Sequence, residues 1–76
     1  MKESLESIIF SLVEDQPSVS IKEIVDGNNV KYEVSVADKD MGRVIGKKGK
    51  IAQSIRTVMK AIAAKEDKKV VVEFID

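Results

Sequence analysis

Cysteine and histidine are both absent from this chain of 76 residues. Without cysteine there is no disulfide, no thiolate nucleophile and no zinc site of the kinds that use thiolates. Without histidine the chain also lacks the commonest general base and a usual ligand for transition metals. Only carboxylates, lysines and hydroxyls are left for catalysis, so the composition predicts a protein that is not an enzyme and holds no metal or cofactor.

Aromatic residues are scarce, because the chain has no tryptophan and only Phe10, Tyr32 and Phe74. Modules that stack bases on aromatic side chains, such as RRM sheets and OB-folds, are therefore disfavoured. Long apolar runs are missing as well. In the N-terminal segment the longest is Ile8-Ile9-Phe10, far shorter than a secretory signal or a membrane span requires. The chain is predicted to be cytoplasmic, with no membrane partner.

The formal net charge is zero, but the charges are unevenly distributed. Residues 1–42 contain nine acidic and four basic side chains, whereas residues 43–69 contain nine basic side chains and only Glu66 and Asp67 as acids. The neutral sum hides a strongly basic segment that could form one face of the molecule. A chain of this length suits one small domain, which we expect to span residues 1–76.

The first half of the chain predicts a helix followed by a hairpin. Apolar residues repeat at helical spacing between residues 4 and 14, and Pro17 follows closely enough to end this helix. Segments 19–25 and 30–36 are rich in β-branched residues and surround a polar turn, as in an antiparallel hairpin. The second segment alternates strictly, whereas the first changes phase at Ile24, which suggests a bulge or the end of the strand.

The second half predicts two helices and a strand. Asp38 or Asp40 could cap a short helix that ends at Gly46, and helical spacing resumes over residues 51–64. The final run, residues 70–75, is short and rich in β-branched residues, as expected of a mostly buried strand. The predicted order is α-β-β-α-α-β, an α+β fold in which a three-stranded sheet packs against three helices.

Two glycines enclose a pair of lysines between the last two predicted helices, in the sequence Gly46-Lys47-Lys48-Gly49. Gly46 can adopt the left-handed geometry that ends a helix, and Gly49 lets a ligand backbone approach the amides of the next helix. The first turn of a helix carries unpaired N–H groups and a partial positive charge, which normally attract acidic side chains. Here the turn carries lysines, including Lys50, and this predicts an external anion such as a phosphate.

The spacing of the glycines does not fit a nucleotide-hydrolysing loop. Such a loop has four residues between its glycines and a serine or threonine after its lysine. Gly42 and Gly46 are separated by three residues, and Lys47 is followed by another lysine. No Gly-x-Gly-x-x-Gly motif follows a strand, so a dinucleotide site is not supported either. We therefore expect binding without catalysis.

The loop and its flanks resemble a known family. The sequence Val44-Ile45-Gly46-Lys47-Lys48-Gly49 is similar to the defining loop of KH domains, which clamps about four nucleotides. Two predicted strands precede the loop and one follows it, so the whole chain resembles the type II, prokaryotic KH arrangement. Its small size and the segment Ile55-Arg56-Thr57 resemble the small bacterial KH-domain protein A family. Ala52 is a departure, because many KH domains have a large aliphatic residue there.

The resemblance implies roles for individual residues. The two loop lysines would contact phosphates, three further cations would support them, and apolar side chains would line a groove beneath the bases. Core packing is the alternative for Ile45 and Ile55, and a solvated helix face is the alternative for Arg56 and Lys60. The candidate interface consists of Gly46, Lys47, Lys48, Gly49, Lys50, Arg43 and Arg56 around the loop, and of Val44, Ile45, Ile51, Ala52 and Ile55 in the groove.

We therefore predict a protein that binds single-stranded RNA in the cytoplasm, as an RNA chaperone or post-transcriptional regulator. The alternative is a protein-interaction module with a KH fold, for which RNA contact is secondary. A small core gains stability from assembly, and a second copy raises the effective concentration of binding loops. The resemblance implies two such partners, a second copy of the chain or a larger KH-containing protein of the Jag/EloR type.

Overall fold

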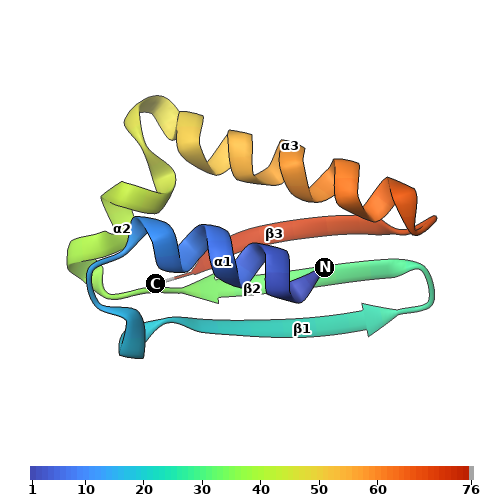
Figure 1. Cartoon of the computed structure of the whole chain (residues 1–76), viewed down its shortest axis with the longest axis horizontal. Helices are drawn as coiled ribbons and strands as arrows, with labels where there is room; N and C mark the ends of the chain where they lie inside the picture. Colours follow the sequence, from blue (N-terminus) through green and yellow to red (C-terminus); the bar gives the residue numbers. More distant parts are fainter. Residues whose placement is uncertain (76) are drawn as a thin grey trace.

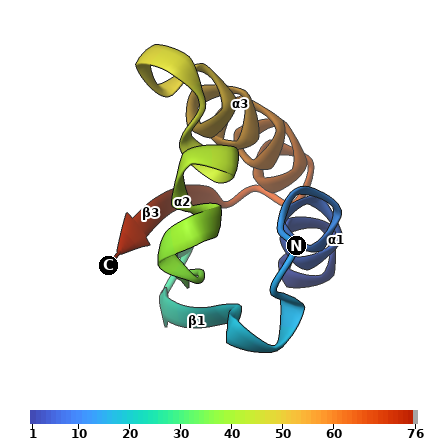
Figure 2. The same ribbon diagram turned by 90° about the vertical axis from the view of Figure 1, so that its left-hand side faces the viewer.

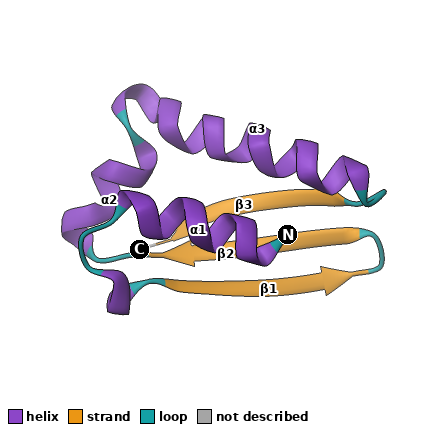
Figure 3. Cartoon of the chain, in the orientation of Figure 1, coloured by secondary structure: helices purple, strands orange, loops and turns teal. Residues whose placement is uncertain are grey.

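The computed structural model describes residues 1–75, in which three α-helices cover one face of a three-stranded sheet (Figure 1). Two short 3₁₀ turns complete the structure (Figure 3). Within this range no helix combines the length and the apolar character needed to cross a bilayer. The predicted α-β-β-α-α-β order is confirmed. The elements are α1 (Lys2–Leu12), η1 (Gln16–Ser18), β1 (Ser20–Asp26), β2 (Asn29–Ser35), α2 (Asp38–Ile45), η2 (Lys47–Gly49), α3 (Lys50–Lys65) and β3 (Lys69–Ile75).

The central strand of the sheet is β2. It pairs antiparallel with β1, and Gly27 supplies the positive φ of 60° that the tight turn between them needs. On its other side β2 pairs parallel with β3, from Asn29 opposite Lys69 to Ser35 opposite Ile75. A parallel pair needs a crossover connection. Here α2, η2 and α3 form the crossover, so the basic segment lies between two paired strands.

One edge strand, β1, is left largely uncovered by the helices. Its pairing with β2 runs without interruption through Ile24, opposite Lys31, so the predicted bulge or strand end at Ile24 is wrong. The exposed fraction is 39% for Ile24 and 59% for Val25, although these side chains point to opposite faces. Because neither face of β1 is well packed, its residues need not alternate strictly between apolar and polar types.

The core lies between the helices and the covered face of the sheet. Every second residue of β2 and β3 is buried or half-buried there, against the apolar stripes of α1 and α3. Tyr32 is fully buried, and its hydroxyl donates a hydrogen bond to Oε2 of Glu23 at 2.7 Å. Burial and this bond raise the pKa of Tyr32. The largest fully buried side chains are Tyr32, Leu5, Ile9, Met59, Val34, Val44 and Asp40.

Candidate nucleic-acid interface

The loop between α2 and α3 begins at Gly46, which ends α2. Gly46 has a φ of 76° and a ψ of 175°, and its N–H donates a hydrogen bond to the carbonyl of Gly42 at 2.9 Å. A Cβ atom on Gly46 would lie 2.6 Å from Cγ1 of Ile51 and 2.9 Å from its backbone nitrogen. The backbone conformation and the contact with Ile51 both require glycine, so the chain folds back tightly onto the start of α3.

Lys48 and Gly49 turn the chain a second time. Both have left-handed backbone conformations, with φ of 56° for Lys48 and 74° for Gly49. A Cβ atom on Gly49 would meet nothing within 4 Å, so there is room for a side chain at this position. Glycine is favoured there because of its positive φ and not because of a lack of space. For lysine this conformation costs about 1 kcal/mol or more, and strain of this kind is concentrated at functional sites. The surrounding structure therefore holds an exposed lysine in an unfavourable conformation.

The N-terminus of α3 carries unpaired positive charge. No side chain caps its N–H groups, and no acidic residue lies in its first turn. Lys47, Lys48 and Lys50 are exposed, and within residues 1–75 none of them forms an ion pair. A phosphate would accept hydrogen bonds from the N–H groups and would neutralise the lysines. The geometry is suited to an anion, and binding of a phosphate at this site stays a prediction.

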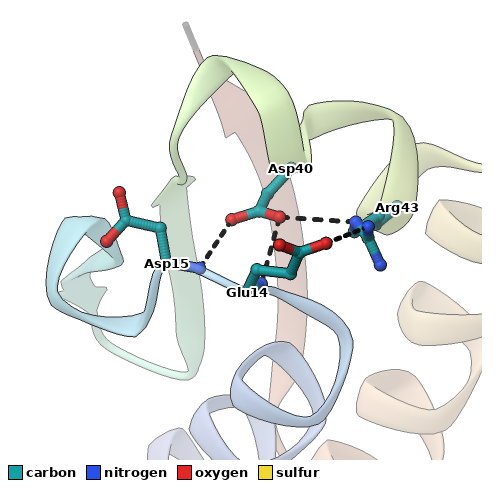
Figure 4. A network of polar contacts seen from close by, with 4 residues as sticks. All are labelled: Glu14, Asp15, Asp40 and Arg43. Carbon is teal, nitrogen blue, oxygen red and sulfur yellow. Dashed lines mark hydrogen bonds and ion pairs between the residues drawn. The ribbon is translucent and has the colours of Figure 1, made fainter.

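Asp40 is buried and ties α2 to the segment that follows α1 (Figure 4). Its two carboxylate oxygens accept hydrogen bonds from the backbone N–H groups of Glu14 and Asp15, each at 3.0 Å. These bonds hold the pKa of Asp40 below its usual range. The N-cap of α2 is Ala37, and no side chain caps this helix. The prediction that Asp38 or Asp40 caps α2 is wrong, because the buried carboxylate binds another segment.

Arg43 takes part in the same network (Figure 4). Its guanidinium forms an ion pair with the carboxylate of Glu14, and its Nε lies 3.5 Å from Oδ1 of Asp40. Two carboxylates already neutralise this guanidinium, which weakens its attraction for a phosphate. Contact between Arg43 and nucleic acid stays a prediction, and the contacts that the structure shows hold α2 in place.

Arg56 reaches from α3 to β3. Its Nε donates a hydrogen bond to the carbonyl of Val72 at 3.0 Å, and its guanidinium lies 5.6 Å from the centre of the Phe74 ring. Within residues 1–75 no carboxylate pairs with it. A guanidinium has five N–H donors, and only one of them is used here. Arg56 is half-buried and held in place, so the alternative of a solvated helix face does not describe it.

The five apolar candidates contribute mainly to the packing around the loop. Three are almost fully buried and two are half-buried, so core packing is the role that the structure shows for Ile55. Contact between any of the five and a base stays a prediction. The exposed fractions are 0% for Val44, 2% for Ala52 and 4% for Ile55, whereas Ile45 and Ile51 are the half-buried pair.

The two sides of α3 differ. On one side Ile51, Ile55 and Val58 line an apolar cleft with α1. On the other side Arg56 contacts β3, and the end-on view shows α1 and β3 on opposite sides of α3 (Figure 2). Of the residues predicted for the interface, Ile51 and Ile55 therefore lie on the α1 side of α3 and Arg56 on the β3 side. Periodicity identifies a helix, but it does not say which elements flank each of its sides.

Three residues that shape this region were not predicted to do so. Val72 and Phe74 hold Arg56, and Asp40 fixes α2. The alternation in β3 is a signal for the first two, because it places both side chains on the face that meets the helices. Asp40 offers no comparable signal, since an acidic residue in the first turn of a helix is ordinary.

Residues 2–74 match the protein-family model described as KhpA/KhpB, KH domain. The chain belongs to this family. The protein named RNA-binding protein KhpA in Clostridium acetobutylicum is 51% identical over 99% of this chain and 100% of its own length. The protein of the same name in Listeria monocytogenes is 42% identical over 100% of this chain and 100% of its own length. The one in Chlamydia trachomatis is 37% identical over 100% of this chain and 97% of its own length. The resemblance inferred from the sequence is confirmed.

A solved structure shares the fold. In the crystal structure of Era in complex with MgGDPNP and nucleotides 1506–1542 of 16S ribosomal RNA, one chain matches 95% of the present chain with a TM-score of 0.60. The identity is 22% and the match covers 28% of the Era chain, so this likeness concerns the fold alone. The type II KH arrangement predicted from the order of elements is confirmed.

Proposed function

We propose that this protein binds single-stranded RNA through the Gly46–Gly49 loop and the first turn of α3. The observation that carries the proposal is the uncapped start of α3, where three exposed lysines surround N–H groups with no acid nearby. Phosphates bind there, and the bases lie towards Arg56 and β3. Relatives that match over their whole length carry the name RNA-binding protein KhpA. This name supports RNA as the ligand.

The cellular role that we infer is that of an RNA chaperone or post-transcriptional regulator in the cytoplasm. Contacts to phosphates position a protein on nucleic acid but carry no sequence information. A loop that clamps about four nucleotides, mainly by their backbone, therefore suits a protein that acts on many RNAs. No catalytic step is part of this proposal.

Charge reversal in the loop tests the proposal. The double variant Lys47→Asp/Lys48→Asp should lose at least about tenfold in affinity for a pool of short single-stranded RNAs, because two phosphate contacts become repulsive. For the wild type, log affinity should fall with log salt by about 0.7 per phosphate contact. Fluorescence anisotropy across a salt series measures both quantities.

A matched variant controls for net charge. Lys22→Asp/Lys65→Asp makes the same change in charge at exposed positions outside the loop, and it should bind RNA almost like the wild type. Circular dichroism verifies that all three proteins are folded. Equal RNA binding by the wild type and the loop variant, or none by either, would contradict the proposed function.

A second candidate function is pairing with another protein, and the cleft between α1 and α3 favours it. Its lining is almost entirely apolar, and Val58 is 45% exposed there. Exposed apolar surfaces of this kind mark interaction sites. The partner that we infer is a second copy of the chain or a larger KH-containing protein of the Jag/EloR type. A pairing surface on the α1 side of α3 leaves the β3 side open to RNA, so the two functions are compatible.

A further inference from the structure

The outer edge of β1 carries backbone groups that have no partner. β1 comes first in the sheet order β1-β2-β3, so it pairs with β2 on one side only, and Figure 1 shows it along the outer edge of the sheet. Every second N–H and C=O group of an edge strand points away from the sheet, where another strand can pair with it. Among residues 1–75 no other segment forms backbone hydrogen bonds with this edge.

Natural proteins usually protect such edges, and β1 has few of the protective features. Its seven residues pair with β2 in unbroken register from Ser20 to Asp26, without a proline or a bulge. Its one lysine, Lys22, belongs to a residue type that discourages strand pairing when the charge stays unpaired. The edge is therefore long and regular enough to accept a partner strand, provided that the partner places an acidic residue opposite Lys22.

The open face of β1 is complementary to itself. Successive side chains of a strand point to opposite faces, and Glu23 lies opposite Tyr32, which is buried on the helix side. Lys22, Ile24 and Asp26 therefore share the uncovered face. Ile24 is 39% exposed and lies midway between the cation and the anion. Turning the strand end to end exchanges the two charges and leaves Ile24 in place, so a second copy of β1 offers the acidic residue that the first one needs.

The charges select one antiparallel register for two copies of β1. When the pairing is centred on Ile24, Lys22 of each copy lies opposite Asp26 of the other, and the two isoleucines meet between the ion pairs. Centring on Glu23 places two carboxylates opposite each other, and centring on Lys22 does the same with two ammonium groups. Like charges directly opposite are destabilising, whereas opposite charges and facing apolar residues stabilise a pair of strands.

We propose that β1 pairs with β1 of a second copy of this chain, antiparallel and centred on Ile24, so that two three-stranded sheets join into one of six strands. This surface is separate from the cleft between α1 and α3, and both views show the Gly46–Gly49 loop at the opposite end of the molecule from β1 (Figures 1 and 2). The inference does not depend on RNA binding. The interface is small, so this pairing should be weaker than one through the apolar cleft.

Cysteine cross-linking tests the pairing directly, because the chain has no cysteine of its own. Opposite residues of antiparallel strands have Cβ atoms about 5 Å apart, within reach of a disulfide. In a glutathione redox buffer, Ile24→Cys should form at least about fivefold more disulfide-linked dimer than Val71→Cys. Val71 is the matched control, because it is 54% exposed on the same open face but lies on β3, at the other edge of the sheet. Non-reducing gel electrophoresis measures the dimer.

A mixture of two variants tests the register. Chains with Lys22→Cys and chains with Asp26→Cys should cross-link when they are mixed, because the two introduced thiols lie opposite each other while the second ion pair stays intact. Each variant alone should remain monomeric on the gel, since its two thiols would be four residues apart along the strands, about 13 Å. Adding Val58→Asp should leave these results unchanged, because Val58 lies in the cleft between α1 and α3.

The other outcomes contradict the inference. If Ile24→Cys cross-links no more than Val71→Cys, contacts at this edge are random collisions. If Lys22→Cys alone cross-links as well as the mixture does, the register is wrong. If Val58→Asp abolishes the cross-links, the copies meet through the apolar cleft and not through β1. Circular dichroism verifies folding, and if Ile24→Cys does not fold, the mixture decides. RNA binding through Lys47 and Lys48 is measured separately, so none of these results affects the loop site.

Discussion

Gly42 and Gly46 lie one helical turn apart, yet the structure places opposite demands on them. A Cβ atom on Gly42 would meet nothing within 4 Å, whereas one on Gly46 would overlap Ile51 in a backbone conformation that disfavours other residues. We expect Gly46→Ala to lower the free energy of unfolding by about 2 kcal/mol. Gly42→Ala, inside α2, should raise it by about 0.5 kcal/mol. Urea unfolding measures the stability of both variants. If Gly46→Ala is as stable as the wild type, Ile51 can move away from the added methyl group without loss of stability.

Side chains of the same chemical type have different roles in this protein. The role of each is determined by the residues that it contacts, which are distant in the sequence. The sequence indicates an anion site at the loop, because the glycines and lysines responsible are adjacent in the chain, and this site stays a prediction. The sequence suggested equivalent roles for Arg43 and Arg56, as cations that support the loop lysines. Arg43 is engaged by Glu14, far away in the sequence, and Arg56 by Val72. Local patterns contain no information about such contacts, so these roles could not be predicted.

At the scale of elements, α2 is a short helix whose position is fixed from outside. Asp40 binds two backbone N–H groups beyond the end of α1, so replacing its carboxylate should loosen the start of the crossover that carries the loop. Asp40→Asn keeps the size of the side chain but turns one acceptor into a donor that faces an N–H group. We expect this variant to unfold at a lower urea concentration than the wild type at pH 7.

The effect of Asp40→Asn should depend on pH. The pKa of Asp40 is lowered in the folded protein, so its carboxylate stabilises the fold at neutral pH, and this contribution fades as pH falls below the unfolded value of about 3.9. The stability difference between wild type and variant should therefore be constant above about pH 5 and shrink below about pH 4. Asp38→Asn is the control, an exposed position in the same turn. A difference that persists unchanged into strong acid would contradict this role for Asp40.

The elements themselves were largely predictable. Helical spacing and β-branched alternation located all three helices and all three strands, because those patterns report burial on one side. The error at Ile24 arose because burial there does not follow a simple period. Ile24 lies on an edge strand that the helices leave largely uncovered. Its exposure depends on how the elements are arranged around each other, which periodicity leaves undetermined.

At the scale of the whole molecule, the two sides of α3 predict two separable interactions. Val58→Asp places a charge in the apolar cleft between α1 and α3, and it should weaken self-association by at least about tenfold because that charge would be desolvated in a dimer. RNA affinity per chain should change little. Sedimentation velocity over a range of concentrations measures association, with Val71→Asp as a control at an exposed valine of β3. The proposed pairing surface would be contradicted if Val58→Asp associates as strongly as the wild type, or if the wild type is monomeric at every concentration.

The parallel pairing of β2 with β3 affects the order in which the protein becomes functional during synthesis. Each residue of β2 pairs with a residue about forty positions later, so the ladder closes only after the whole crossover has been made. The loop leaves the ribosome before β3 does, and until then Arg56 lacks the strand that positions it. A nascent chain thus displays its loop lysines early, whereas the contact that fixes Arg56 on β3 forms only with its last strand.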